Sequence, residues 1–241
     1  MVLTIVCFSC SCKKDNTSSS SGSFYLPKTY TEDVRSSVIG NSLVTYNLTF
    51  DDDYRITSIT ATPAPASLRF VYAYPSKDQV TLDLYEQGNL SIHEIFWLNA
   101  FSRVDSTFRY NNTGDSSTEK YIYDPSHSLE TQKSYDYSAS GAVLNNTTSF
   151  VYDMFGNVEE SIDDQGRTID YQYYIDLHNT LNMGTPYIPQ SVFFVKTEKL
   201  MEGGTTETVT HYYTFDSNDR LTKDSAATTG VDLIAIKSYT Y

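Results

Sequence analysis

The chain has 241 residues, enough to bury the core of a single all-β domain. It contains 21 tyrosines and 12 phenylalanines but only 11 glycines and 7 prolines, and this excess of aromatic residues favours strands. The formal net charge of −13, without any cluster of lysines and arginines, argues against nucleic acid as a partner.

The first residues predict export and a lipid anchor. The body of the protein should lack disulfide and thiolate chemistry, because all the cysteines come early, at Cys7, Cys10 and Cys12. A short apolar run from Met1 to Phe8, followed by small residues and Cys12, resembles the end of a bacterial lipoprotein signal, although no basic residue precedes the run. The alternative, a membrane-spanning helix, would need about 20 apolar residues. We therefore expect residues 1–12 to be a signal segment with lipid attached at Cys12, and the serine-rich residues 13–23 to be a flexible tether.

A repeated turn pattern organises the rest of the chain. An aromatic or aliphatic residue is followed by Asp or Asn, three turn residues, one variable residue and a hydrophobic residue. Asp and Asn side chains accept hydrogen bonds from backbone N–H groups two residues on, so the pattern predicts a hairpin between two strands. Looser copies begin at Tyr74-Pro75 and Tyr137-Ser138. The predicted structural anchors of these turns are Asp51, Asn99, Asp124, Asp153 and Asp216.

A second set of turn signals lies between these anchors, as at Glu86-Gln87-Gly88-Asn89 and Asn111-Asn112-Thr113-Gly114. The chain should therefore run up and down as an all-β antiparallel meander, with the acid-anchored turns on one rim and the second set on the other. We expect about fifteen strands, or about sixteen if Lys28 to Arg35 pairs in, with very little helix. A sheet of this size must curve or close like a barrel, and residues 24–241 would form one domain.

Alternation along the predicted strands gives the sheet two different faces. Between residues 44 and 50, for example, Val, Tyr, Leu and Phe point one way while Thr and Asn point the other. The aromatic face is either ordinary core or a binding surface for a sugar, peptide or lipid. Its candidate ligand contacts are Tyr46, Tyr72, Tyr74, Tyr213 and His211.

The turn pattern is clearest in the segment from Phe150 to Val158, which reads Phe-Val-Tyr-Asp-Met-Phe-Gly-Asn-Val. This segment resembles the YD repeats of RHS-type proteins. Together with Cys12-Lys13-Lys14-Asp15, it makes the chain similar to Bacteroidetes lipoprotein families of unknown function with a porin-like fold. The resemblance covers roughly residues 25–241 and implies a large curved or barrel-like sheet at the cell envelope, but no biochemical activity.

The sequence contains no recognisable catalytic site. The histidines show no metal-ligand spacing, and neither a nucleophile elbow nor a phosphate-binding loop occurs. Adjacent acids such as Glu159-Glu160 face opposite sides of a strand, so they cannot flank one glycosidic bond. The cluster Asp51-Asp52-Asp53 lacks the spaced ligands of a calcium loop. We expect no enzymatic activity, no metal and no cofactor.

Three functions remain open. The leading hypothesis is a non-enzymatic binding protein for a sugar, peptide or lipid ligand, exported and lipid-anchored at the outer membrane on its periplasmic or cell-surface side. Its partners would be the membrane, through the anchor, and a small-molecule, glycan or protein ligand, and we expect a monomer. The second is a structural scaffold or adhesin, and the third is an outer-membrane β-barrel. The segment from Asp176 to Gln190 interrupts the repeat and is interpreted as a plug over one end of the sheet or as a binding loop.

Overall fold

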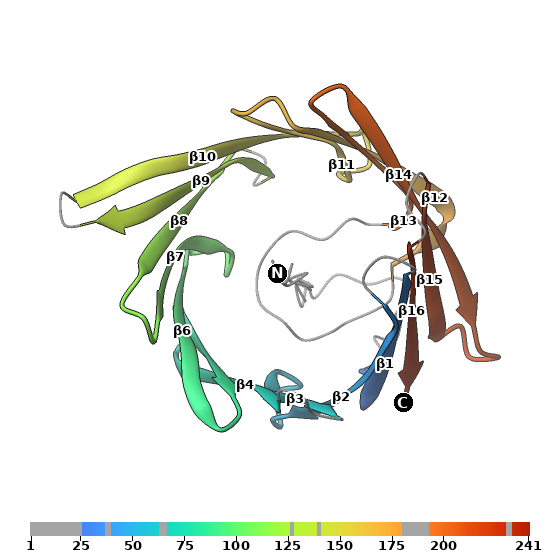
Figure 1. Cartoon of the computed structure of the whole chain (residues 1–241), viewed down its shortest axis with the longest axis horizontal. Coiled ribbons are helices and arrows are strands. Elements are labelled where there is room, and N and C mark those ends of the chain that lie inside the picture. The colour runs from blue at the N-terminus through green and yellow to red at the C-terminus, as the bar shows by residue number, and fades with distance from the viewer. Residues whose placement is uncertain are drawn as a thin grey trace.

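The computed structural model describes residues 26–36, 40–62, 67–125, 128–138, 141–179, 193–229 and 233–241. Within these ranges the strands form one closed antiparallel barrel in which each strand pairs with its neighbours in the chain (Figure 1). The described residues contain no helix that is long and apolar enough to cross a membrane. The strands are β1 (Thr29–Ser36), β2 (Ser42–Phe50), β3 (Ile56–Thr62), β4 (Leu68–Ser76), β5 (Gln79–Glu86), β6 (Asn89–Leu98), β7 (Val104–Asn111), β8 (Ser116–Tyr123), β9 (Leu129–Ser138), β10 (Gly141–Tyr152), β11 (Val158–Asp163), β12 (Thr168–His178), β13 (Phe193–Glu202), β14 (Thr205–Phe215), β15 (Leu221–Thr229) and β16 (Leu233–Thr240).

The predicted all-β meander is confirmed, and the sheet closes. The barrel has 16 strands because the segment after the tether does pair in, as β1. Val34 of β1 lies opposite Ala235 of β16 on one side and Ser42 of β2 on the other. The first strand therefore seals the gap between the second strand and the last. The predicted signal segment, Cys12 and the tether lie outside the described residues.

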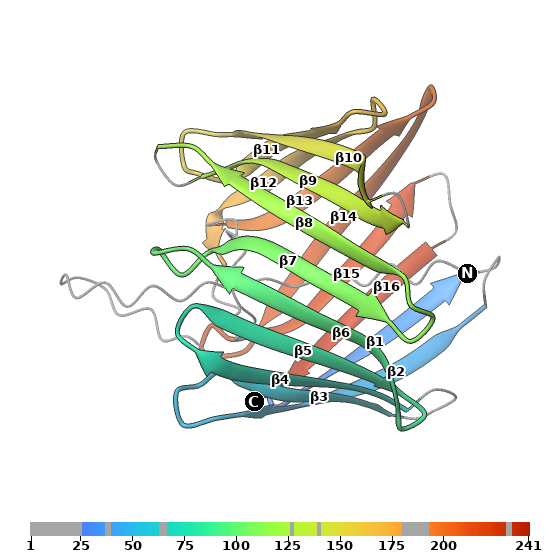
Figure 2. The same ribbon diagram turned by 90° about the vertical axis from the view of Figure 1, so that its left-hand side faces the viewer.

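The hairpin turns form two rims (Figure 2). The turns that follow β2, β6, β8, β10 and β14 begin at the predicted anchors, and we call their side of the barrel the Asp rim. At the first of them, Asp51 Oδ1 accepts the N–H groups of Asp53 and Arg55 at 3.0 and 2.9 Å. Asn99, Asp153 and Asp216 make the same pair of bonds, and Asp124 accepts the N–H of Ser128. One carboxylate or amide oxygen thus holds each of these turns closed.

The opposite rim uses the same device twice, which the sequence pattern did not single out. Asn111 accepts the N–H groups of Thr113 and Asp115, and Asp163 accepts those of Gln165 and Arg167. The geometry therefore marks a type of hairpin and not one end of the barrel.

The ladder registers assign every strand residue to one of two walls, since directly opposed residues share a face and successive residues alternate. Leu48 lies opposite Ile59, and both are at most 9% exposed. Their neighbours Thr49 and Thr60 are on the other face. We call the buried, concave face the inner wall and the other face the outer wall.

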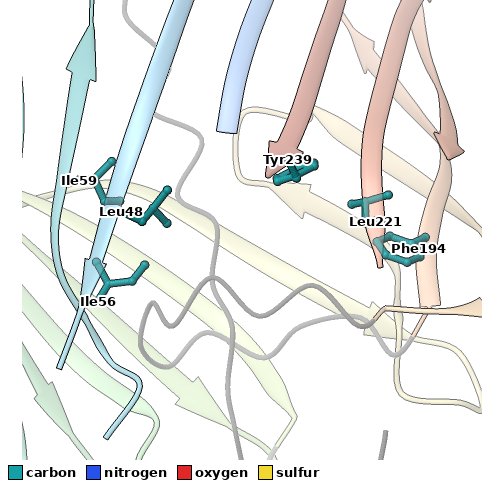
Figure 3. Packing of buried hydrophobic residues seen from close by; sticks show 6 residues of the cluster. All are labelled: Leu48, Ile56, Ile59, Phe194, Leu221 and Tyr239. Atoms are coloured by element: carbon teal, nitrogen blue, oxygen red, sulfur yellow. The ribbon is translucent and has the colours of Figure 1, made fainter. Parts of the chain in front are cut away.

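The apolar core lies on the inner wall close to the Asp rim. One cluster joins Leu48, Ile56 and Ile59 of the early strands to Phe194, Leu221 and Tyr239 of the late strands (Figure 3). A second cluster contains Val104, Tyr121 and Leu129. These clusters line the end of the barrel where the acid-anchored turns lie.

Tyrosines tie neighbouring hairpins together at this rim. Tyr74, near the end of β4, donates its hydroxyl proton to the carbonyl of Ile56 at the start of β3, at 2.8 Å. Equivalent bonds run from Tyr123 to Val104, Tyr173 to Val158, Tyr213 to Val195 and Tyr241 to Leu221. Arginines from the turns cover some of these rings: Arg55 lies 4.3 Å from the centroid of Tyr74, and Arg220 lies 4.9 Å from that of Tyr241. Tyrosine hydroxyls and backbone carbonyls therefore lock one hairpin to the next at the Asp rim.

Candidate functional site on the inner wall

Charged side chains gather on the inner wall where the late strands meet β1. Ladder pairs place Glu32 of β1 opposite Lys237 of β16, and Lys237 opposite Asp224 of β15. Across the next two ladders, His211 of β14 and Glu198 of β13 continue the row. We call these five residues the His211 cluster; consecutive strands of one sheet hold them in place.

His211 is the centre of this cluster. Its Nδ1 lies 3.1 Å from Oδ1 of Asp224, and its Nε2 lies 3.2 Å from Oε1 of Glu198. Only 14% of the His211 side chain is exposed. Both ring nitrogens therefore face carboxylate oxygens, an arrangement that suits the doubly protonated, cationic imidazolium.

The electrostatics agree with that protonation state. Burial lowers the pKa of His211, but hydrogen bonds to Asp224 and Glu198, and the charges of these two acids, raise it to about 9. The net effect keeps the ring cationic near neutral pH.

Burial also governs Lys237. It lowers the pKa of this lysine, and the negative charges of Glu32, Asp224 and Glu198 oppose the effect only in part. Three carboxylates thus share two cationic partners inside the barrel, which leaves this part of the wall acidic.

Aromatic rings adjoin the cluster on its Asp-rim side. Tyr213 stacks on His211 with ring centroids 6.0 Å apart and planes 8° from parallel. Tyr30 and Tyr46 stack at 4.5 Å, and Tyr239 lies against Tyr30 at 6.1 Å. Burial raises the pKa of the Tyr30, Tyr46, Tyr213 and Tyr239 hydroxyls, so these phenols stay protonated.

A second polar group lies on the inner wall of β6 to β9. Glu94, 4% exposed, binds Nη2 of Arg109 at 2.9 Å. Glu119 accepts hydrogen bonds from the Tyr121 hydroxyl and from Nε2 of Gln132. Burial raises the pKa of Glu94, and Arg109 opposes that rise. The inner wall therefore carries acidic side chains on two groups of strands, in each case beside the apolar clusters of the Asp rim.

The structure divides the five predicted ligand contacts. His211 and Tyr213 lie together in the polar region, and Tyr46 stacks on Tyr30 nearby. Tyr72 packs on the apolar cluster of Leu48 and Ile59, and the Tyr74 hydroxyl is bonded to backbone at the rim. The predicted residues thus share the inner wall, but only part of the set adjoins the charged groups.

Sequence reasoning missed the charged partners of His211. Glu198 and Asp224 each lie thirteen residues from His211 in the chain, and the two hairpins bring them to opposite sides of the ring. It also treated the fifth turn position as variable, although Arg55 and Arg220 there bind the anchors Asp51 and Asp216 through Nε at 2.7 Å. The recurrence of arginine at this position was the available signal.

The other histidines do not join the site. His93 lies on the outer wall, with Nδ1 2.5 Å from Oδ1 of Asp83. His127 and the side chain of His178 lie outside the described residues, as does most of the segment from Asp176 to Gln190. Among the residues that the structure describes, no three His, Cys, Asp or Glu side chains come together in a way that could hold a metal ion.

The outer wall has a different chemistry. Threonine and serine hydroxyls bond across neighbouring strands, as between Thr31 and Thr45 at 3.2 Å and between Thr49 and Ser58 at 2.8 Å. Charged residues are scattered among them, and the ladder registers place these on the outer wall: Asp33, Arg35, Arg69, Asp83, Lys120, Lys133, Glu160, Asp170, Lys199 and Lys223.

Solved structures share this architecture. A porin-like protein from Bacteroides uniformis superposes with a TM-score of 0.65 at 12% sequence identity, covering 89% of this chain and 97% of that one. A porin-like protein from Bacteroides vulgatus gives a TM-score of 0.58 at 12% identity, covering 90% and 98%. No family model and no curated protein matches the sequence. The chain therefore has a porin-like β-barrel fold, as the resemblance of its sequence implied.

Proposed function

We propose that this protein is a non-enzymatic binding protein of the cell envelope whose ligand site is the His211 cluster on the inner wall. The observation that carries the proposal is the row of paired, partly buried charges from Glu32 to Glu198, centred on His211, beside stacked tyrosines. Buried charges cost free energy unless they are paired, and pairs of this kind are often neutral or unfavourable for stability compared with apolar residues. Their presence inside an otherwise apolar barrel end is therefore better explained by recognition than by folding.

The chemistry of the site favours a ligand rich in hydrogen-bond donors. Glu32, Glu198 and Asp224 supply acceptor oxygens in excess of the cationic donors Lys237 and His211. Tyrosine rings beside them offer flat faces with a polar tip, which suit the apolar face of a sugar ring or a short side chain. A sugar, an amino sugar or the amino end of a peptide can both donate hydrogen bonds to the acids and pack on the tyrosine rings. An acyl chain can only pack on the rings.

A ligand panel tests this proposal. The full chain would be titrated by calorimetry with neutral sugars, amino sugars, short peptides and fatty acids. We expect a donor-rich ligand to bind and its affinity to fall at least about tenfold in Asp224→Asn or Glu198→Gln, the scale of one lost charged hydrogen bond. Ser225→Ala, next to Asp224 but on the outer wall, is the matched control. Binding that is unchanged in both acid variants would refute the inner-wall site.

The outer wall supports a barrel surrounded by water. A lysine or arginine facing the middle of a bilayer costs about 2–4 kcal/mol, so the charges spread over the outer wall would oppose insertion in lipid. The threonine and serine hydroxyls between these charges can be hydrated in water, so exposing them there has no comparable cost. We therefore assign the protein to the aqueous side of the envelope, held to the outer membrane by lipid at Cys12, in preference to an embedded outer-membrane barrel.

A further inference from the structure

The Asp rim carries exposed apolar side chains at its turn tips. The exposed fractions are 71% for Tyr54, 53% for Phe101, 90% for Met154 and 54% for Phe155. They belong to the turns after β2, β6 and β10, and we call them the apolar tips. Phe155 also makes an edge-to-face aromatic contact with Phe193 at 5.7 Å.

The turn geometry does not require these residues. The turn at Asp216 makes the same two side-chain hydrogen bonds as the turn at Asp153, yet it has Ser217 and Asn218 where the latter has Met154 and Phe155. Tyr54 even adopts a left-handed backbone, with φ 61°, which is unfavourable for a bulky side chain. Exposed apolar groups at interchangeable positions indicate contact with something outside the barrel.

The opposite rim provides the contrast. The described turn residues there are polar or glycine: Gly40 and Asn41, Ser67, Gln87 and Gly88, Asn112 to Asp115, Asp164 to Arg167, and Gly203 with Gly204. The apolar tips are therefore a property of one end of the barrel and not of its hairpins in general.

The amino-terminal end of the described chain lies at the same rim as the apolar tips. The described chain enters β1 at the Asp rim, where the N–H of Lys28 donates to the carbonyl of Thr240 at 2.7 Å and its carbonyl accepts from the N–H of Leu48 at 2.8 Å. The tether that the sequence predicts between Cys12 and Leu26 would span roughly 20 Å. With lipid at Cys12, the Asp rim is the end of the barrel that stays nearest to the bilayer.

We propose that the apolar tips dock the Asp rim on the surface of a phospholipid bilayer and orient the barrel axis towards it. Methionine and aromatic side chains at exposed tips insert shallowly at the boundary between headgroups and acyl chains. Because Asp52, Asp53 and Asp219 also lie at turn tips of this rim, the matching surface is zwitterionic and not strongly anionic. The inference is independent of the ligand site on the inner wall.

Depth-dependent quenching tests this docking. Trp97 is the single tryptophan, so Trp97→Phe gives a silent background for the full chain. Phe155→Trp would report from the Asp rim, and Leu43→Trp, at a position 60% exposed near the opposite rim, would be its matched control. Each protein would be bound through an amino-terminal polyhistidine tag to phosphatidylethanolamine and phosphatidylcholine vesicles containing a chelating lipid, with and without brominated acyl chains.

We expect bromine to quench the tryptophan at position 155 and not the one at position 43. Adding Phe101→Ser and Met154→Ser to the Phe155→Trp chain should remove most of that quenching, and circular dichroism would verify the fold of every variant. Equal quenching at both positions, or none at either, would overturn the proposal. If the tips instead joined two copies of the chain, the serine substitutions would change the sedimentation coefficient and leave position 155 unquenched.

Discussion

The two walls of the barrel come from the same strands but face different surroundings. On β3, Ile59 is buried in the apolar cluster while the next residue, Thr60, lies on the outer wall among hydroxyl and charged groups. On β14, His211 is held between two carboxylates inside while Tyr212 is 58% exposed outside. The difference shows that apolar packing and paired charges share one wall, whereas the other wall carries hydroxyl and charged groups together with exposed apolar side chains.

The largest expected effect comes from shortening an apolar side chain of the inner wall while the outer wall is left unchanged. Ile59→Ala removes a side chain packed in the core and should lower the free energy of unfolding by about 2–5 kcal/mol. Thr60→Ala, one residue on, should change it by less than about 0.5 kcal/mol. Urea denaturation followed by circular dichroism measures both. Similar losses in the two variants would mean that the walls are assigned wrongly.

A second contrast compares the inner histidine with the outer one. Because the folded-state pKa of His211, about 9, lies above its ordinary value of 6.5, its protonation stabilises the fold. That stabilisation, on the order of 2 kcal/mol, is complete below about pH 6.5 and is lost as the pH rises through about 9. Urea denaturation across this range should show a decline that His211→Gln lacks and His93→Gln, on the outer wall, retains. A decline of the same size in all three proteins would show that His211 is not its source.

A third comparison measures how much the hairpin turns contribute to stability in addition to the packing of the walls. Asp51→Ala removes the acceptor of two backbone N–H groups and of Arg55, so we expect a loss of about 1–3 kcal/mol. Asp52→Ala removes the same charge one residue later, at the turn tip, where the side chain does not anchor the turn, and should be close to neutral. The difference in their urea midpoints gives the contribution of the turn anchor. Equal midpoints for the two variants would mean that the turn anchor contributes nothing to stability.

The smallest expected effect concerns single hydroxyl groups. Tyr123→Phe removes the inner-wall bond to the carbonyl of Val104 and should cost about 1 kcal/mol. Tyr85→Phe, on the outer wall of β5, should cost less than about 0.5 kcal/mol. Thermal unfolding of both variants and of the parent chain resolves this difference. A greater loss at Tyr85 would contradict the structural role assigned to the rim tyrosines.

Local signals predicted most of the fold. The strands, the hairpin turns and their two rims follow from alternation and from Asp or Asn at turn positions, because both are short-range effects. The exact number of strands and the closure of the barrel depended on whether β1 pairs with β16, a contact between the two ends of the chain. Turn chemistry alone does not specify such a pairing.

The candidate site was predictable only in part for the same reason. His211 and Tyr213 were recognised because both lie on one face of one strand. Glu198 and Asp224 reach His211 only through the registers of β13 with β14 and of β14 with β15. A shift of either register by one residue would turn the acid to the opposite wall, so the cluster becomes visible only with the ladder pairing in hand.

Sedimentation without detergent tests the central claim most directly, namely that the outer wall faces water and that the candidate ligand site therefore lies on the inner wall. The full chain with Cys12→Ser, which removes the proposed site of lipid attachment, would be purified and centrifuged in buffer alone. We predict a soluble, folded species with the mass of one 27.2 kDa chain. A protein that aggregates in buffer and becomes a folded monomer only in detergent micelles would contradict the account.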